Sequence, residues 1–471
     1  MSASPTEITN QYLEGMFAPI HEETTAERLP VIGELPRELA GTFVRNSPNP
    51  RFTPEGRYHW FDGDGMLHGL HLRDGEATYR NRWVRTRGFA LEEQAGHALF
   101  TGLMMPIKRD NPHGPAKNTS NTDLVVHGGK LLSLWWLGGE PYAIDPRDLS
   151  TVGPHSFGGT LRCGFAAHPK VCPVTGEMIF IDYSPVKPPY LTAGLVSPQG
   201  EVVRVVPIDL PGPRLLHDIA ITEHYTILLD FPMTWDREAL KAGKRRVIFD
   251  RSLPSRFGIM PRHGGSADVR WFEAPPCYMY HTINAYEEGS EIVLTGCRID
   301  DPLPGPSHAR RETTPTIDIL ELTPFMHRWR IDLEKGTVRE EALDDVLSEF
   351  PRMNSARLGQ KTRYSYNCRL APRPTLLFDG VIKYDAETGR SETYAYEKGR
   401  YGSEVVFVPR PGGTDEDDGY LVTFTQDERD GHSEFIVFDA RAVPAGPRAR
   451  VPIPKRIPIG FHGTWVDETS I

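Results

Sequence analysis

Short runs of aliphatic, β-branched and aromatic residues, each closed by Gly, Pro or Asp, recur along almost the whole chain. Such runs are typical of antiparallel strands joined by tight turns. In the clearest example an apolar run at 124–126 is followed by a His-Gly-Gly turn and a second apolar run at 130–136. Similar runs occupy residues 201–208, 225–229, 246–249, 291–295, 403–408, 420–425 and 434–439. The chain is therefore predicted to be mostly β.

The spacing of these runs favours a propeller. The 44 glycines and 42 prolines are spread along all 471 residues, as expected where many short strands need many turns. Seven blades of four strands, at about 8–12 residues per strand, require roughly 220–340 residues. Two packed sandwiches are the alternative, but no polar linker separates two cores. We predict a single all-β domain over residues 1–471, a seven-bladed β-propeller.

Helical pattern is confined to three short segments, residues 90–100, 235–242 and 341–350. Residues 1–25 are expected to form an N-terminal arm. The insertions near residues 86–117 and 230–262 are expected to cover one face of the propeller.

Charge and cysteine usage exclude several classes of protein. Lys and Arg number 53 against 63 Asp and Glu, a net charge of −10, which argues against a dedicated nucleic-acid binder. The five cysteines contain no CxxC pair, so neither a disulfide framework nor a zinc knuckle is expected. No signal-peptide pattern and no run of 18 apolar residues occurs. The sequence predicts a cytoplasmic protein.

Four of the 17 histidines stand out by their local context. They are His168 in AHPK, His217 in LHD, His281 in HTINA and His462 in FHG. Their separations of 49, 64 and 181 residues exclude a local metal motif such as HExxH. Four neutral imidazoles would suit divalent iron and leave two octahedral positions open. The spacing alone does not show that the four converge.

Several motifs occur in one order along the chain: GTFVRN at 41–46, FDGDGM at 61–66, NTSNT at 118–122, and the four histidine contexts. In these motifs the chain resembles the carotenoid cleavage oxygenase family, which includes stilbene- and phenylpropene-cleaving enzymes and the vertebrate retinoid isomerase. The resemblance covers nearly the whole sequence.

The resemblance implies a seven-bladed propeller with a dome of loops and short helices over the iron-containing face. One Fe(II) per chain would be held by His168, His217, His281 and His462. With O2 as co-substrate, the protein would cleave a conjugated C=C bond to give two carbonyl products, as an alkene-cleaving dioxygenase.

The resemblance also assigns residues around the iron ligands. Glu349 would support His281 and Glu404 would support His462, because such partners fix the tautomer of a ligating imidazole. Where the family has a third glutamate, this chain has Trp136, whose indole cannot accept the imidazole N–H hydrogen bond. Thr122 matches a threonine that lies near the open iron positions.

The substrate prediction depends on Trp135, which replaces a lysine that binds a phenolic oxygen in stilbene- and isoeugenol-type members. Flat aromatic and methionine surfaces suit a long apolar polyene. The sequence thus favours a carotenoid- or apocarotenoid-like alkene, with an aryl alkene of the stilbene or isoeugenol type as the alternative. The expected tunnel residues are Trp60, Phe61, Met104, Met105, Trp135 and Phe165.

Two other classes of protein stay open at this point. A drifted, non-catalytic binder of apolar ligands is compatible with Trp136. A calcium-dependent hydrolase on a propeller would use carboxylate and amide oxygens, whereas the matched positions here are imidazoles. The resemblance also implies that the protein can contact a membrane peripherally around the tunnel entrance. The sequence does not determine the oligomeric state.

Overall fold

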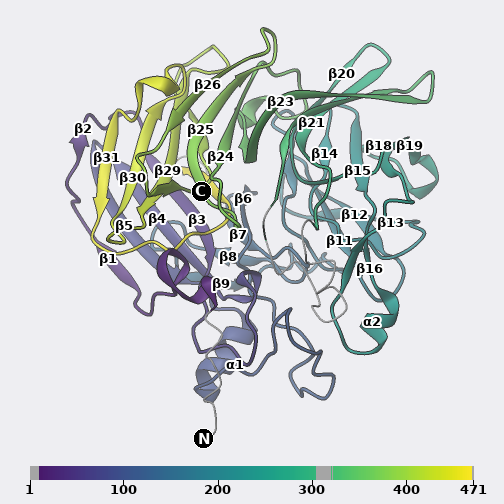
Figure 1. Ribbon diagram of the computed structural model, residues 1–471, viewed down its shortest axis with the longest axis horizontal. Helices are drawn as coiled ribbons and strands as arrows, with labels where there is room; N and C mark the ends of the chain where they lie inside the picture. The colour runs from purple at the N-terminus through teal and green to yellow at the C-terminus, as the bar shows by residue number, and fades with distance from the viewer. Residues whose placement is uncertain (1–9, 304–319, 321, 469–471) are drawn as a thin grey trace, which may run out of the picture.

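The computed structural model describes residues 10–303, 320 and 322–468, which form a seven-bladed β-propeller. Its sheets surround a centre close to the C-terminus (Figure 1). The predicted all-β class is confirmed. The only α-helices of the described residues are α1 (Arg87–Ala95) and α2 (Arg237–Lys241). They correspond to the helices predicted at 90–100 and 235–242, displaced by a few residues.

The first three blades are separate four-stranded antiparallel sheets. Blade 1 contains β6 (Asp123–His127), β7 (Lys130–Leu134), β8 (Tyr142–Ile144) and β9 (Thr151–Pro154); blade 2 contains β10 (Lys170–Val171), β11 (Met178–Tyr183), β12 (Leu191–Val196) and β13 (Val202–Ile208); blade 3 contains β14 (Ala220–Ile221), β15 (Tyr225–Asp230), β18 (Ser255–Pro261) and β19 (Arg270–Ala274).

The next three blades are joined edge to edge, so that their strands share one continuous sheet. Blade 4 contains β20 (Tyr278–Glu288), β21 (Glu291–Ile299), β22 (Phe325–Asp332) and β23 (Thr337–Arg352); blade 5 contains the end of β23 with β24 (Tyr364–Leu370), β25 (Phe378–Asp385) and β26 (Arg390–Ala395); blade 6 contains β28 (Val406–Pro409), β29 (Gly419–Asp427), β30 (Ser433–Asp439), β31 (Ala449–Ile453) and β2 (Ile32–Gly33). The short strand β27 (Arg400–Gly402) links β25 to β29.

Strand β23 corrects one expectation. Residues 341–350 show apolar residues at helical spacing, but they are extended and pair first with β22 and then with β24. Tertiary pairing on both sides overrides the local helical pattern. The reason is that strand pairing satisfies the backbone hydrogen-bonding groups where two blades join edge to edge.

Blade 7 closes the ring with both ends of the chain. Its innermost strand is the C-terminal β32 (Gly463–Asp467), which pairs with β3 (Gly41–Pro48). Strands β4 (Gly65–Arg73), β5 (Glu76–Trp83) and β1 (Thr24–Ala26) follow outward. Strand β32 also contacts the inner strands β6 and β28 of the two neighbouring blades. The first and last parts of the chain thus depend on each other for pairing.

The two insertions dock on each other at one side of the propeller, at the bottom of Figure 1. The Arg245 guanidinium donates to the carbonyls of Gly102, Met105 and Pro115, and the Ile107 amide donates to the Gly243 carbonyl. Helix α1 begins at the N-cap Thr86, whose hydroxyl accepts from the Phe89 amide. The strand pair β16 (Met233–Trp235) and β17 (Val247–Phe249) carries α2 between its strands.

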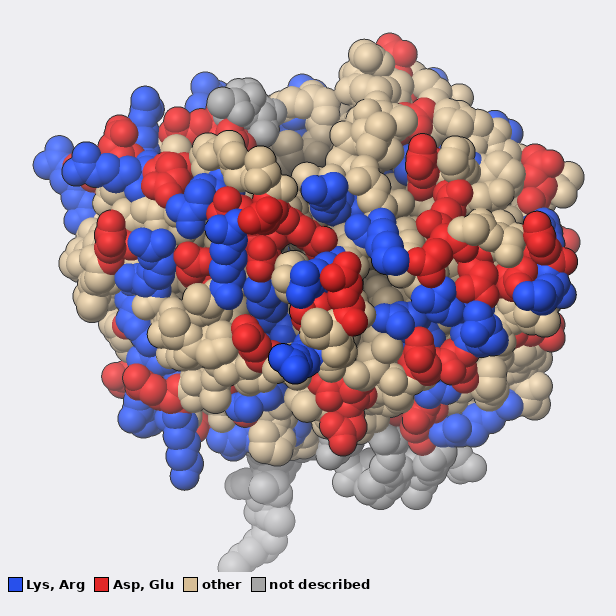
Figure 2. All heavy atoms as spheres, turned by 90° about the horizontal axis from the view of Figure 1, so that it is seen from above, with Lys and Arg blue, Asp and Glu red and all other residues tan. Residues whose placement is uncertain are grey.

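The outer surface mixes acidic and basic side chains, and the face seen in Figure 2 has no large area of one sign. Among the described residues, no helix has the length and apolar character that a membrane crossing needs.

Candidate metal centre

Each blade places one polar residue at the axis. This residue lies at the start of the innermost strand or strand segment of the blade, or just before it. Neighbouring inner strands contact one another around the ring, as β14 does with β20 and β20 with β23. In blade order these residues are Thr122, His168, His217, His281, Glu349, Glu404 and His462. Residues far apart in the chain therefore meet at the axis of the propeller.

The four histidines bring one nitrogen each within 4.8 Å of the other three. The Nε2 atom of His217 lies 3.1 Å from Nε2 of His168 and 3.2 Å from Nε2 of His281. Two nitrogens that each lie about 2.1 Å from one metal ion are separated by about 3 Å when they are at right angles. The spacing thus fits adjacent ligands of a single ion.

Two of these histidines donate from Nδ1 to a glutamate. His281 Nδ1 lies 2.6 Å from Glu349 Oε2, and His462 Nδ1 lies 3.0 Å from Glu404 Oε1. A neutral imidazole that donates from Nδ1 has only a lone pair on Nε2. The Nε2 atoms at the centre are therefore set up as metal ligands rather than as partners of one another.

His168 has a carboxylate partner that the sequence analysis missed. Its Nδ1 lies 3.1 Å from Asp123 Oδ2, which also accepts from the His168 backbone amide. Burial works to raise the pKa of Asp123, but the charge and hydrogen bond of His168 outweigh it and hold this pKa below its usual range. Asp123 comes directly after the NTSNT element at 118–122, but this position alone does not indicate that it faces His168.

His217 has no such partner: among the described residues no carboxylate contacts it, and the close nitrogens of His168 and His281 both face its Nε2. Its ring packs edge-on against Tyr280, with centroids 5.1 Å apart. Burial, reinforced by the neighbouring histidines, lowers the pKa of His217 and of His462 well below the usual value. Both rings are therefore neutral near pH 7 and available to bind a cation.

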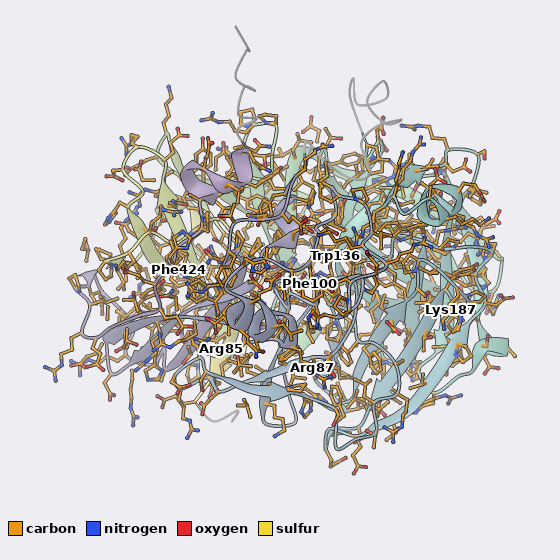
Figure 3. All side chains as sticks on the ribbon, turned by 90° about the horizontal axis from the view of Figure 1, so that it is seen from below. Arg85, Arg87, Phe100, Trp136, Lys187 and Phe424 are labelled. Carbon is orange, nitrogen blue, oxygen red and sulfur yellow. The ribbon has the colours of Figure 1, made fainter. Side chains whose placement is uncertain are left out.

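Trp136 lies where the sequence resemblance places a glutamate, near the middle of the molecule (Figure 3). Its backbone amide donates to Thr122 Oγ1 at 3.1 Å, and its carbonyl accepts from the Tyr183 hydroxyl at 2.9 Å. The indole Nε1 is buried without a hydrogen-bond partner. The side chain is thus fixed by packing and contributes no acceptor to His217.

An apolar cavity adjoins the histidines on one side. His217, His281 and His462 line it together with Thr122 and Trp136. The rest of its wall includes Phe61, Leu320, Leu322, Leu376 and Phe461. A space with this lining suits an apolar ligand held beside the metal centre.

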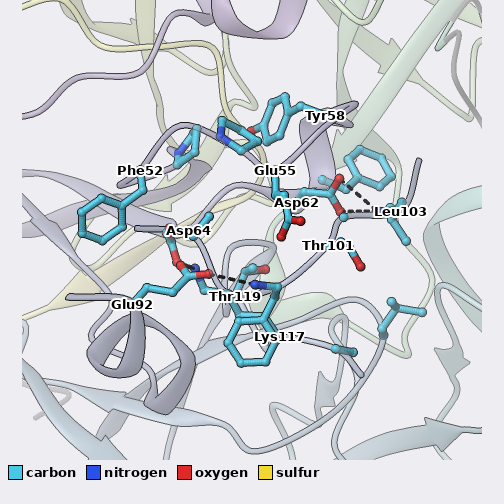
Figure 4. A pocket seen from close by; sticks show the side chains of 18 of the residues that line it. Phe52, Glu55, Tyr58, Asp62, Asp64, Glu92, Thr101, Leu103, Lys117 and Thr119 are labelled. Atoms are coloured by element: carbon cyan, nitrogen blue, oxygen red, sulfur yellow. Dashed lines mark hydrogen bonds and ion pairs between the residues drawn. The ribbon is translucent and has the colours of Figure 1, made fainter. Parts of the chain in front are cut away.

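A second cavity lies between the propeller and the insertion at 86–117 (Figure 4). Lys117 Nζ forms ion pairs there with Asp64, at 2.5 Å, and with Glu92. Burial raises the pKa of Asp62 to about 6, although its carboxylate accepts hydrogen bonds from backbone amides of Leu103 and His59. Charged side chains thus line this second cavity, whereas the first cavity is apolar.

The predicted tunnel residues separate into two groups. Phe61 lines both cavities, and Trp135 lines the charged one, with its Nε1 buried and unpartnered. The other four lie outside both linings. They are Trp60, Met104, Met105 and Phe165.

Phe165 and Trp60 are core residues. Phe165 stacks between Phe157 and Phe180, with centroid distances of 5.4 and 4.2 Å, in the core between blades 1 and 2. Trp60 stacks on Tyr12 at 5.8 Å and is 1% exposed. Aromatic character alone did not distinguish these residues from cavity residues, because both environments are apolar.

Residues 17–467 match the family described as retinal pigment epithelial membrane protein. The carotenoid 9,10(9',10')-cleavage dioxygenase 1 of Arabidopsis thaliana is 39% identical over 98% of this chain and 90% of the relative. The chain belongs to the carotenoid oxygenase family. The predicted family is confirmed.

Solved structures of family members superimpose on almost the whole chain. The lignostilbene dioxygenase of Pseudomonas brassicacearum matches with a TM-score of 0.89 and 28% identity, covering 99% of this chain and 100% of that one. A cobalt-substituted Synechocystis apocarotenoid oxygenase matches with a TM-score of 0.82 and 28% identity, covering 95% and 97%. The carotenoid oxygenase fold therefore spans the described residues.

Proposed function

We propose that the protein is a non-haem iron oxygenase that cleaves a conjugated C=C bond of a carotenoid- or apocarotenoid-like substrate with O2 into two carbonyl products. The observation that carries this proposal is the convergence of four imidazoles, three of them held by carboxylates, beside an apolar cavity. The Arabidopsis relative named for carotenoid cleavage supports the choice of substrate class.

His168, His217, His281 and His462 would hold one Fe(II). When bound there, ferrous iron supplies the redox chemistry that activates O2. Asp123, Glu349 and Glu404 fix the orientation of three ligand rings and increase their basicity. Imidazoles suit a transition metal better than calcium, which prefers oxygen ligands, so the calcium-dependent hydrolase is not favoured.

The apolar cavity would bind the alkene and exclude water from the reacting double bond. Holding one bond of a conjugated chain beside the metal selects the bond that is cleaved. Thr122 lies in the cavity wall, where its Oγ1 donates to Asn121 Oδ1 at 3.0 Å and accepts from the Trp136 amide. We propose that Thr122 limits the space beside the iron that is open to O2.

Cleavage of an aryl alkene is the second candidate, favoured by the TM-score of 0.89 to a lignostilbene dioxygenase. The difference lies at Trp135, which gives the charged cavity an indole in place of a lysine. We therefore expect phenolic stilbenes to bind less tightly than polyenes.

Because apolar polyenes partition into bilayers, we also propose a cytoplasmic enzyme that meets its substrate at a membrane surface.

The test is to express the full chain with iron, measure its metal content, and follow O2 uptake with carotenoids, apocarotenoids, stilbenes and phenylpropenes. We expect about one iron per chain and two carbonyl products from a polyene. The His281→Ala variant is the matched control and is expected to consume no O2. Iron-loaded protein that cleaves no member of the panel, yet binds a polyene, would establish the non-catalytic binder instead.

A further inference from the structure

The histidine cluster separates two spaces of opposite character. The apolar cavity lies on one side. On the other, a channel runs along the inner strands, and residues of all seven blades contribute to its wall. Towards its outer end it is lined by exposed residues such as Pro173, Ser355 and Ala356. The channel thus joins the histidines to solvent along the propeller axis.

Charged side chains line this axial channel. Three carboxylates, Asp123, Asp218 and Glu404, share the wall with two cations, Lys170 and Arg352. Lys170 Nζ lies 2.6 Å from Asp218 Oδ1, and Arg352 lies 2.7 Å from Glu404 Oε2. Among the described residues Asp123 forms its one side-chain pair with His168, so the wall carries one more negative than positive charge when that ring is neutral. Carboxylate oxygens in a hydrated channel readily replace water around a divalent cation.

The ligands are not equally accessible from the two sides. His168 lines the axial channel and not the apolar cavity, whereas His217 lines the cavity and not the channel. His281 and His462 line both. An ion arriving along the channel would meet three of the four ligands before it reached His217.

The apolar side offers a hydrated ion no comparable path. Its wall is built from side chains such as Phe61, Leu320, Leu376 and Phe461, and removing water from a divalent ion there is strongly unfavourable. We infer that divalent metal ions reach the four-histidine cluster through the axial channel, while the alkene uses the apolar cavity. This inference depends on the proposed metal site.

The inference is tested by changing charge near the outer end of the channel. Ala356 is exposed in a short 3-10 turn (Ser355–Arg357) and lines the channel without contacting a histidine. Full-length protein is stripped of metal, and uptake of Co²⁺ is followed by visible absorbance for Ala356→Glu, Ala356→Lys and the neutral control Ala356→Gln. At low ionic strength we expect the Glu variant to take up Co²⁺ about tenfold faster than the Lys variant. The ratio should approach one near 1 M salt, where the Debye length is about 3 Å.

Two controls distinguish an effect of charge at the channel from an effect of the overall net charge of the protein. Val203→Glu and Val203→Lys make the same charge changes at an exposed position on β13, the outermost strand of blade 2. We expect their uptake rates to agree within about twofold. Prior saturation with an apolar stilbene is expected to leave the uptake rate unchanged, because the stilbene occupies the other side.

Equal rates for the Ala356 pair at low salt, or slower uptake after stilbene saturation, would overturn the inference. Failure of every form, including the unmodified chain, to bind Co²⁺ at equilibrium would instead contradict the proposed metal site. The two failures are therefore distinguishable.

Discussion

The histidine cluster has two unlike parts. His281, His462 and His168 each have a carboxylate on Nδ1, at 2.6, 3.0 and 3.1 Å. His217 packs against Tyr280 and lines the apolar cavity together with Trp136, with no carboxylate among the described residues that contact it. The propeller fold thus determines the position of each histidine, whereas a neighbouring carboxylate determines which ring nitrogen carries the proton.

This difference predicts unequal roles within one metal site. The three supported rings have a fixed tautomer with a lone pair on Nε2. The tautomer of His217 is left to packing and to any ion that binds at its Nε2. The supported part should therefore dominate metal affinity, and the unsupported part should be the place where affinity can be gained.

The largest effect is expected from removing a supported ligand. His462→Ala takes away one imidazole and leaves Glu404 Oε1 without the donor it has now, while Glu404 Oε2 keeps Arg352 and the Gly463 amide. We expect loss of bound iron after dialysis and of alkene-dependent O2 uptake. Metal analysis with circular dichroism checks this, since the fold should persist. Retention of a full complement of iron would mean that His462 is not a ligand.

Removing a supporting carboxylate should have the next largest effect. Glu349→Gln keeps the size of the side chain but replaces the carboxylate that accepts from His281 Nδ1. We expect metal affinity to fall by about 10–100-fold. Competition with a coloured chelator measures this affinity. An unchanged value would show that the Glu349 contact does not tune the ligand.

Supplying the missing carboxylate should have a smaller and opposite effect. Trp136→Glu places an acceptor next to His217, and Trp136→Gln is the matched control because it removes the same indole without adding charge. We expect the Glu variant to bind metal about tenfold more tightly than the Gln variant. Equal affinities would indicate that the backbone at Trp136 holds the side chain out of reach of His217.

The smallest effect on the metal site is expected from a carboxyl group outside the histidine cluster. Asp62 has a raised pKa of about 6, so folding favours its protonated form. Its contribution to the free energy of unfolding is fully present below about pH 4 and falls by up to about 3 kcal/mol as the pH rises through about 6. Asp62→Asn should abolish this decline without changing metal affinity.

Urea unfolding of both proteins between pH 4.5 and 7 tests the last prediction, because the difference between them cancels the titration of all other groups. Parallel stability curves would show that the Asp62 carboxyl is ionised in the folded protein at every pH examined.

Sequence patterns predicted local elements well where pairing is local. The hairpin of β6 and β7 follows directly from two apolar runs around His127-Gly128-Gly129, because a tight turn brings adjacent strands together. The same approach was wrong for residues 341–350, where partners from β22 and β24 decide the conformation. It also missed Asp123, since nothing local indicates that an aspartate faces an imidazole 45 residues away.

By itself the sequence determined the strand-rich class, the four histidine contexts and the substitution at Trp136. These are properties of residue type and neighbouring residues. Only the tertiary structure decided that the inner strands bring these histidines together, that Asp123 supplies a carboxylate to His168 while His217 has none among the described residues, and that Phe165 lies in the core. Convergence at an axis depends on the closure of the whole ring through β32 and β3, a long-range pairing that no local pattern encodes.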